Sequence, residues 1–126
     1  MRYFIHSEFD QKGLPGSGEK FMDRLFLSQL DALRHKCKFP FIINSGYRSP
    51  EYNNQISTTG FYGAHTTGKA ADIAVERQNA YLLLQNALEM ECFTGIGIKQ
   101  HGDRRFIHLD TLTPDEALRP TIWSYN

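Results

Sequence analysis

The chain has 126 residues, with 14 lysine or arginine and 14 aspartate or glutamate side chains, so its formal net charge is zero. A chain of this length is expected to form a single domain, residues 1–126, that buries roughly two thirds of its unfolded surface without disulfide bonds. The balanced charge and the lack of a basic stripe give no sign of a nucleic-acid partner, and we expect a monomer. The N-terminus shows no export signal, and no run of about 18 apolar residues predicts a membrane span.

The first half of the chain predicts two helices and one strand. After the segment 11–18, in which Gly and Pro interrupt any pattern, apolar residues recur at helical spacing and indicate an amphipathic helix over residues 19–36. A short β-rich segment, residues 41–44, ends at Ser45 and Gly46. Ser49 followed by Pro50 is typical of a helix start and predicts a short helix there. Residues 57–68, rich in Thr and Gly, are expected to form a loop.

The second half predicts three strands and one helix. Residues 70–75 have the character of a buried strand, and residues 93–99 and 104–111 predict a hairpin with its turn at 100–103. The pattern as a whole indicates an α+β fold with a small, largely antiparallel sheet and flanking helices. The C-terminal RPTIWSY, which holds Arg119 and Trp123, is expected to pin the end of the chain against the domain. The helix expected over residues 77–90 should turn inward Tyr81, Leu84, Ala87 and Leu88.

Three residues of metal-binding type, His65, Asp72 and His108, lie in the short motifs GAHTTGKAAD and FIHLD. Asp72 is expected on the strand over 70–75, His65 in the loop before it and His108 on a neighbouring strand, so all three can meet at one edge of the sheet. Two imidazoles and a carboxylate form a three-ligand set for one zinc ion and leave a fourth position for the water of a hydrolase. A histidine on a strand is more often an ordinary core or surface group, but the small residues around His65 and Asp72 favour the metal site.

The order of several motifs carries a resemblance to a known family. SGYRSPEYN is followed by H-x-x-G-x-A-x-D from His65 to Asp72, then by GIG with FIHLD, and finally by RPTIWSY. With these motifs the chain resembles the D-alanyl-D-alanine carboxypeptidase branch of the peptidase M15 family over nearly its whole length. The resemblance implies the hedgehog/DD-peptidase fold, which the zinc-binding signalling domain of hedgehog proteins shares. A shared scaffold does not guarantee catalysis, so activity has to be argued from the site.

The resemblance also implies roles for individual residues. His65, Asp72 and His108 would ligate zinc, and Arg48 would face the cleft and hold a carboxylate or carbonyl of the substrate. A guanidinium suits this task because its planar fork matches a carboxylate and never loses its charge. The alternative is a structural arginine bound to loop carbonyls. Ser45 and Tyr47 flank Arg48 as further substrate-binding candidates, Ser45 as a hydrogen-bond donor and Tyr47 more for packing than for chemistry.

The identity of the general base is the point at which the sequence departs from the family. Many members have Glu or Asp three residues before the last zinc histidine, whereas this chain has Arg105. Asp110 is the leading candidate, because residues two apart on a strand share a face with each other. Its alternative role is to orient a ligand imidazole. Asp103 and His101, in the turn before that strand, are the further candidates.

These observations predict a zinc metallopeptidase that hydrolyses D-amino-acid-containing peptide bonds of bacterial peptidoglycan. It would act on the stem peptide as a D-Ala-D-Ala carboxypeptidase or a cross-link endopeptidase. Its place of action would be the cell wall or periplasm, reached as a phage-type endolysin through a separate pore or as part of an exported enzyme. The alternative is a catalytically inactive module, stabilised by zinc, that binds wall peptide or a protein partner.

Overall fold

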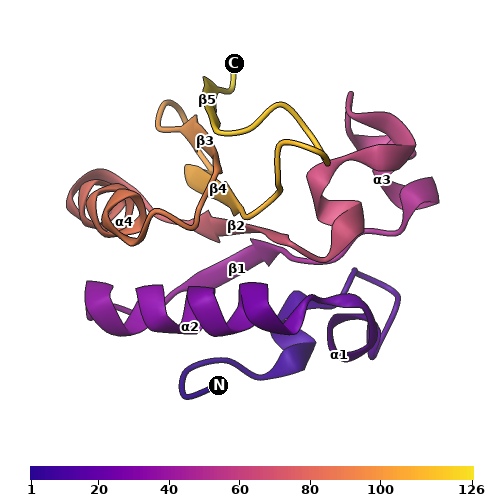
Figure 1. Ribbon diagram of the computed structural model, residues 1–126, viewed down its shortest axis with the longest axis horizontal. Coiled ribbons are helices and arrows are strands. Elements are labelled where there is room, and N and C mark those ends of the chain that lie inside the picture. Colours follow the sequence, from indigo (N-terminus) through magenta and orange to yellow (C-terminus); the bar gives the residue numbers. More distant parts are fainter.

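A five-stranded sheet forms the centre of the computed structural model, which describes residues 1–126 (Figure 1). The strands lie in the order β1-β2-β4-β3-β5, and every neighbouring pair is antiparallel except β3 and β5, which are parallel. This architecture confirms the expected α+β class with a largely antiparallel sheet. The strands are β1 (Ile42–Ser45), β2 (Ala70–Ala74), β3 (Gly95–Lys99), β4 (Phe106–Asp110) and β5 (Thr121–Ser124).

Four α-helices and three short 3-10 helices accompany the sheet. The predicted helix start at Ser49 is confirmed, since its hydroxyl accepts a hydrogen bond from the Tyr52 N–H at 3.2 Å and Pro50 occupies the first turn. None of the helices combines the length and the apolar character that crossing a membrane requires. The helices are η1 (His6–Phe9), α1 (Ser17–Phe21), α2 (Arg24–Cys37), α3 (Pro50–Ile56), η2 (Gly60–Tyr62), η3 (Ala64–Thr67) and α4 (Arg77–Met90).

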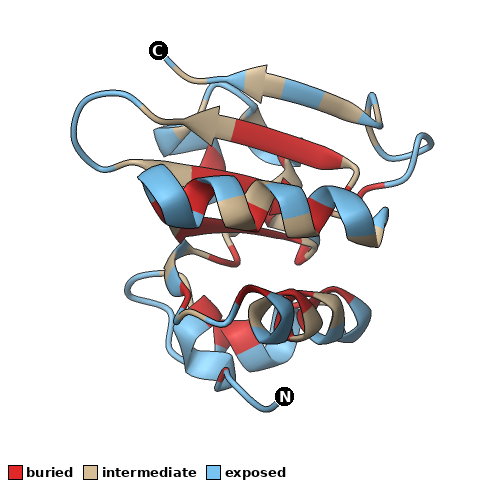
Figure 2. Cartoon of the chain, turned by 90° about the vertical axis from the view of Figure 1, so that its left-hand side faces the viewer, coloured by how far each residue is buried: buried red, intermediate tan, exposed pale blue.

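The two faces of the sheet have different characters. Helices α2 and α4 pack against each other and against the face that carries Ile73, Ile107 and Leu109, which are all almost fully buried. Figure 2 shows buried residues, in red, on the strands and on the inward sides of the helices. Side chains alternate along a strand, so Asp72 and His108, one residue away from core positions, lie on the opposite face. That face is free of long helices and carries the polar residues.

The helix predicted over residues 19–36 is wrong in one respect, because it is two helices that meet at Asp23. The Asp23 carboxylate accepts a hydrogen bond from the Phe26 N–H at 2.9 Å and so caps the start of α2. The backbone N–H of Asp23 donates to the Gly68 carbonyl at 2.9 Å. Gly68 has a φ of +76°, and a Cβ there would lie 2.1 Å from the Phe21 carbonyl. The break between the helices therefore lets Gly68, at the end of the loop that carries His65, pack against residues 21–23.

The inward face predicted for α4 is also partly wrong. Ala87 is buried as expected, but Tyr81 is 69% exposed and Leu88 is 56% exposed. Leu84 packs only at the margin of the core. The face that packs inward is turned by about one residue, roughly 100° around the helix, and α4 lies closest to α2. The buried residues of α4 are Ala80, Leu83 and Ala87.

The C-terminal segment forms a strand that was not expected. Residues Thr121–Ser124 pair with β3 as the parallel edge strand β5, which places Trp123 opposite Gly97. The loop expected over residues 57–68 contains the two short helices η2 and η3. Both cysteines are free thiols, with Cys37 buried and Cys92 half-buried beside the core.

Candidate metal centre

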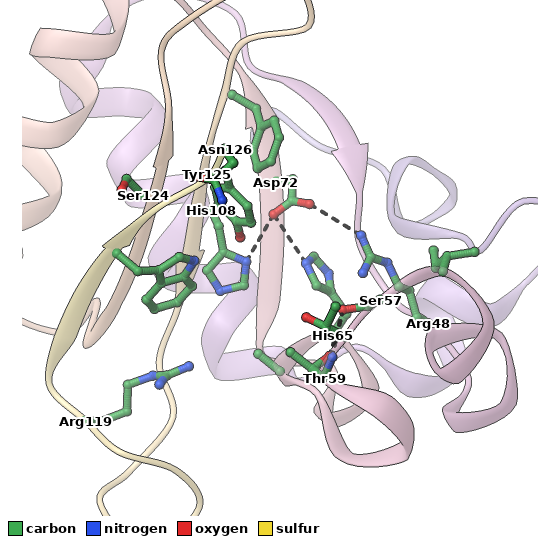
Figure 3. Close-up of a pocket in the computed structure, with 15 residues that line it drawn as sticks. Arg48, Ser57, Thr59, His65, Asp72, His108, Arg119, Ser124, Tyr125 and Asn126 are labelled. Atoms are coloured by element: carbon green, nitrogen blue, oxygen red, sulfur yellow. Dashed lines mark hydrogen bonds and ion pairs between the residues drawn. The ribbon is translucent and has the colours of Figure 1, made fainter.

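Three elements bring His65, Asp72 and His108 together on the polar face of the sheet. Asp72 on β2 lies directly opposite His108 on β4 in the antiparallel register, and His65 comes from η3 just before β2. The Asp72 Oδ1 atom is 3.0 Å from His108 Nδ1 and 3.3 Å from His65 Nε2 (Figure 3). All three side chains are buried, and their ligand atoms lie within 4.8 Å of one another. The three residues thus come together as expected, but on a face of the sheet and not at its edge, because β2 and β4 are inner strands.

The outer nitrogen of each imidazole is held by a fixed partner. His65 Nδ1 lies 2.8 Å from the Gly46 carbonyl oxygen, which can only accept, so Nδ1 carries the proton. His108 Nε2 lies 2.7 Å from Asp110 Oδ2, and its proton points to that carboxylate. These assignments turn His65 Nε2 and His108 Nδ1 toward Asp72, and each of these nitrogens offers a lone pair to a metal ion when its ring is neutral. Partners of this kind fix the tautomer and orientation of metal-binding histidines.

A metal ion fits this donor set. With neutral imidazoles, two nitrogen lone pairs and a carboxylate oxygen would converge with no proton between them, which is unfavourable unless a cation lies at their centre. Ligands held about 2.0–2.1 Å from a tetrahedral zinc ion are ~3.3 Å apart, and the two contacts to Asp72 measure 3.0 and 3.3 Å. No fourth His, Cys, Asp or Glu belongs to the cluster. The residues can therefore hold a metal with a position left open.

The charges around the cluster favour an ionised carboxylate in its middle. Burial alone would raise the pKa of Asp72, but the attraction of His65 and hydrogen bonding from His108 lower it well below its usual range. Burial would lower the pKa of His108, and its hydrogen bonds to Asp110 and Asp72 raise that pKa instead. Arg48 adds a further positive charge, with its Nη2 atom 3.5 Å from Asp72 Oδ2. Asp72 is held as an anion ready to bind a cation.

Asp110 is the most enclosed residue of the site. It is 0% exposed, and Arg119 grips it with two charge-assisted hydrogen bonds, from Nε to Oδ1 at 2.9 Å and from Nη2 to Oδ2 at 2.7 Å. Burial would raise the pKa of Asp110, but hydrogen bonds from His108 and Arg119 lower it to about 2. Gly95 makes room for this carboxylate, since a Cβ there would lie 2.2 Å from Oδ1. Hydrogen bonds thus connect Arg119 to Asp110, and Asp110 to His108.

An open cleft of about 550 Å³ lies over the three metal-binding residues (Figure 3). One wall comes from the segment between α3 and η3, and the other from β5 and the residues after it. Arg48 lines the cleft and donates from Nε to Ser45 Oγ at 3.0 Å and from Nη1 to Asn53 Oδ1 at 3.1 Å. A guanidinium has five N–H groups. One N–H on each terminal nitrogen of Arg48 therefore remains for a substrate.

The other sequence candidates lie at different distances from the cleft. Tyr47 is buried and stacks on Phe21 with ring centroids 4.7 Å apart, as a packing residue does. Asp103 lines a second cavity that also borders Arg48 and Asp72. The His101 side chain is exposed on the hairpin turn, and its Nε2 lies 3.0 Å from the Tyr125 carbonyl.

Three residues of the C-terminal segment belong to the site although the sequence assigned them no functional role. Arg119, Trp123 and Tyr125 line the cleft. The Trp123 ring lies 5.1 Å from the His108 ring, and a Cβ at Gly97 would come within 2.5 Å of the Trp123 indole nitrogen. The only local signal was the pair of glycines in GIG, which marks a strand closely approached by other groups. Burial raises the pKa of the Tyr125 phenol.

An α+β domain with two histidines and one aspartate converging at the floor of an open cleft defines a candidate metal-dependent hydrolase. Comparison with protein families matches residues 7–110 to the family described as Peptidase M15. The chain belongs to the peptidase M15 family, and its class is that of a metallopeptidase with a metal site at His65, Asp72 and His108. No curated protein matches the sequence closely enough to be counted as a relative.

Proposed function

We propose that this protein is a zinc-dependent peptidase that cleaves D-amino-acid-containing bonds of bacterial peptidoglycan, as a D-Ala-D-Ala carboxypeptidase or a cross-link endopeptidase. The observation that carries the proposal is the three-ligand cluster at the floor of an open cleft beside Arg48. A structural zinc site is usually closed by four protein ligands, whereas a catalytic site keeps one position open. The stem peptide is the proposed partner, and the cell wall or periplasm is the proposed place of action.

The protein's residues have separate tasks in this proposal. His65, Asp72 and His108 would hold one zinc ion, which when bound activates a water molecule and polarises the scissile carbonyl. Arg48, fixed by Ser45 and Asp72, directs its two remaining N–H groups at a carbonyl or carboxylate of the substrate. The walls of the cleft position the peptide over the cluster.

Asp110 has the surroundings of an orienting residue more than those of a general base. Both of its oxygens accept hydrogen bonds from Arg119, and it does not line the cleft. The hydrogen bonds from Arg119 also lower the pKa of Asp110, which makes it a weaker proton acceptor. We propose that Asp110 fixes the His108 ring and its tautomer. Asp103 is then the remaining carboxylate candidate for the general base. It is exposed and lines the second cavity, which Asp72 also lines.

A second candidate function is a zinc-stabilised module that binds wall peptide or a protein partner without cutting it. Arg105 in place of an acid and the enclosure of Asp110 favour this alternative, because neither of these two positions supplies a free carboxylate to the cluster. The open ligand position and the available N–H groups of Arg48 favour the enzyme. The enzyme therefore remains the leading proposal.

The test is a mass-spectrometric analysis of purified peptidoglycan fragments after incubation with zinc-loaded protein. The matched pair of variants is His108→Ala, which removes a ligand, and His6→Ala, which removes an exposed histidine that does not line the cleft. Products that form with the wild type and His6→Ala but not with His108→Ala support the peptidase. Their masses distinguish loss of a terminal D-Ala from opening of a cross-link. Bound fragments without any product would support the binding module instead.

A further inference from the structure

A second cavity, of about 620 Å³, adjoins the cleft over the metal-binding residues. The two share three lining residues, Arg48, Asp72 and Phe106, so they lie next to each other on the polar face of the sheet. The second cavity lies toward the β3–β4 turn, at the end of the sheet where Ala74 is paired with Phe106. A peptide that crosses the cluster can therefore extend past Arg48 into this second cavity.

Positive charge is concentrated in the second cavity. Besides Arg48, it is lined by Lys99, Arg104 and Arg105, against the single further carboxylate of Asp103. None of these three cations forms an ion pair with a carboxylate in the structure, although the chain as a whole is neutral. The Lys99 ammonium donates to the backbone carbonyl of His101 at 3.3 Å. Three cations that form no ion pair therefore line the second cavity.

Arg105 is partly fixed in position before any ligand arrives. Its Nε donates to the Gly102 carbonyl at 3.0 Å, which leaves the N–H groups of both terminal nitrogens free. A guanidinium held in this way loses less conformational freedom when it binds a planar anion. Position 105, which carries an acid in many members of the family, thus carries a preorganised arginine in this chain.

We infer that this second cavity is a subsite for a free carboxylate of the substrate peptide, bound by Arg105 with Arg104 and Lys99. The inference rests on the proposed peptidase function and adds a substrate class to it: peptides with a carboxylate several atoms away from the bond that lies over the metal-binding residues. The carboxylate has two possible sources, an acidic side chain or the terminus of the peptide. Neutral peptides of the same length would bind and react less well.

The experiment uses one synthetic D-amino-acid-containing peptide in three forms, with both carboxylates free, with the side-chain carboxylate amidated, and with the terminus amidated. The peptidase kcat/KM is measured with zinc-loaded protein, and Kd is measured by calorimetry with metal-free protein, so that binding is observed without turnover. The test variant is Arg104→Gln with Arg105→Gln. The matched control is Lys36→Gln with Lys38→Gln, which removes two exposed charges that line neither cavity.

The wild type and the control should prefer the free carboxylate over one of the amides by roughly tenfold in kcat/KM and in Kd, and the test variant should lose this preference. The amide that is discriminated against identifies the source of the carboxylate. An equal preference in the test variant, or no preference in the wild type, would overturn the subsite. If no peptide is cleaved, the peptidase proposal fails. The Kd values still test the subsite in that case, because equal binding of the three peptide forms, or no binding of any of them, overturns the subsite.

Discussion

Replacing Asp110 with Asn tests whether this buried carboxylate orients His108 or removes a proton. The substitution keeps the volume of the side chain and one acceptor oxygen but removes the charge. The Arg119 side chain, only 10% exposed, would then lack its counter-ion, and His108 Nε2 would face a neutral acceptor. The substitution therefore removes the negative charge of Asp110, whose carboxylate makes hydrogen bonds of 3.3 Å or less.

The expected loss of stability follows from two estimates. A pKa lowered from 3.8 to about 2 corresponds to about 2 kcal/mol of favourable interaction with the ionised carboxylate. Removing one member of a buried ion pair costs about 3–5 kcal/mol when the other charge stays unpaired. Since the Asn oxygen still accepts one hydrogen bond, we expect Asp110→Asn to lower the free energy of unfolding by about 2–4 kcal/mol. Urea unfolding of the metal-free proteins measures this, with Asp115→Asn, an exposed acid, as the control.

The expected effect on the metal site separates the two roles. An orienting Asp110 predicts zinc affinity weaker by roughly 10–100-fold in the Asn variant, with turnover largely restored when zinc is in excess. Competition with a chromogenic chelator measures the affinity, and the fragment assay measures turnover. Unchanged zinc affinity with turnover lost at every zinc concentration would refute the orienting role and make Asp110 the general base.

Three further predictions concern the supports of the site. Gly97→Ala should lower the free energy of unfolding by roughly 1–3 kcal/mol and reduce activity, since its Cβ would meet the Trp123 indole; urea unfolding that matches the wild type would contradict this. Asp23→Ala, which removes the cap of α2, should cost about 1 kcal/mol in the same assay while zinc affinity stays unchanged. The ionised Asp110 stabilises the fold above about pH 4, so the metal-free protein should lose about 2 kcal/mol as the pH falls from 4 to 2, and Asp110→Asn should lose less.

The ligand set could be predicted because its signals are local in the sequence. His65 and Asp72 lie seven residues apart around a glycine turn, and His108 lies at the middle of a recognisable strand. Alternation along β2 and β4 then places the two strand residues on one face. The residues that hold the ligands in position were harder to predict. Arg119 is eleven residues beyond His108, outside any strand, and only the packed chain brings it to Asp110.

The errors in the helices have the same origin. The apolar spacing over residues 19–36 is continuous, but the contact between Asp23 and Gly68 that divides the helices joins residues 45 positions apart. In α4 the large side chains of Tyr81 and Leu88 suggested the inward face, whereas packing in the folded chain, where α4 contacts α2, buried Ala80 and Leu83. Periodicity indicates that a helix has an apolar face, but packing decides which residues form its centre.

By itself the sequence determined the α+β class, the strands and helices with regular patterns, and the three residues that can hold a metal. These features follow from backbone periodicity and from side-chain chemistry, both of which act over a few residues. The tertiary structure alone decided the parallel strand β5, the two hydrogen bonds of Arg119 to Asp110, and the position of the second cavity beside the metal cleft. These features depend on contacts between distant segments, which form only when burial of the core fixes the register and spacing of the strands.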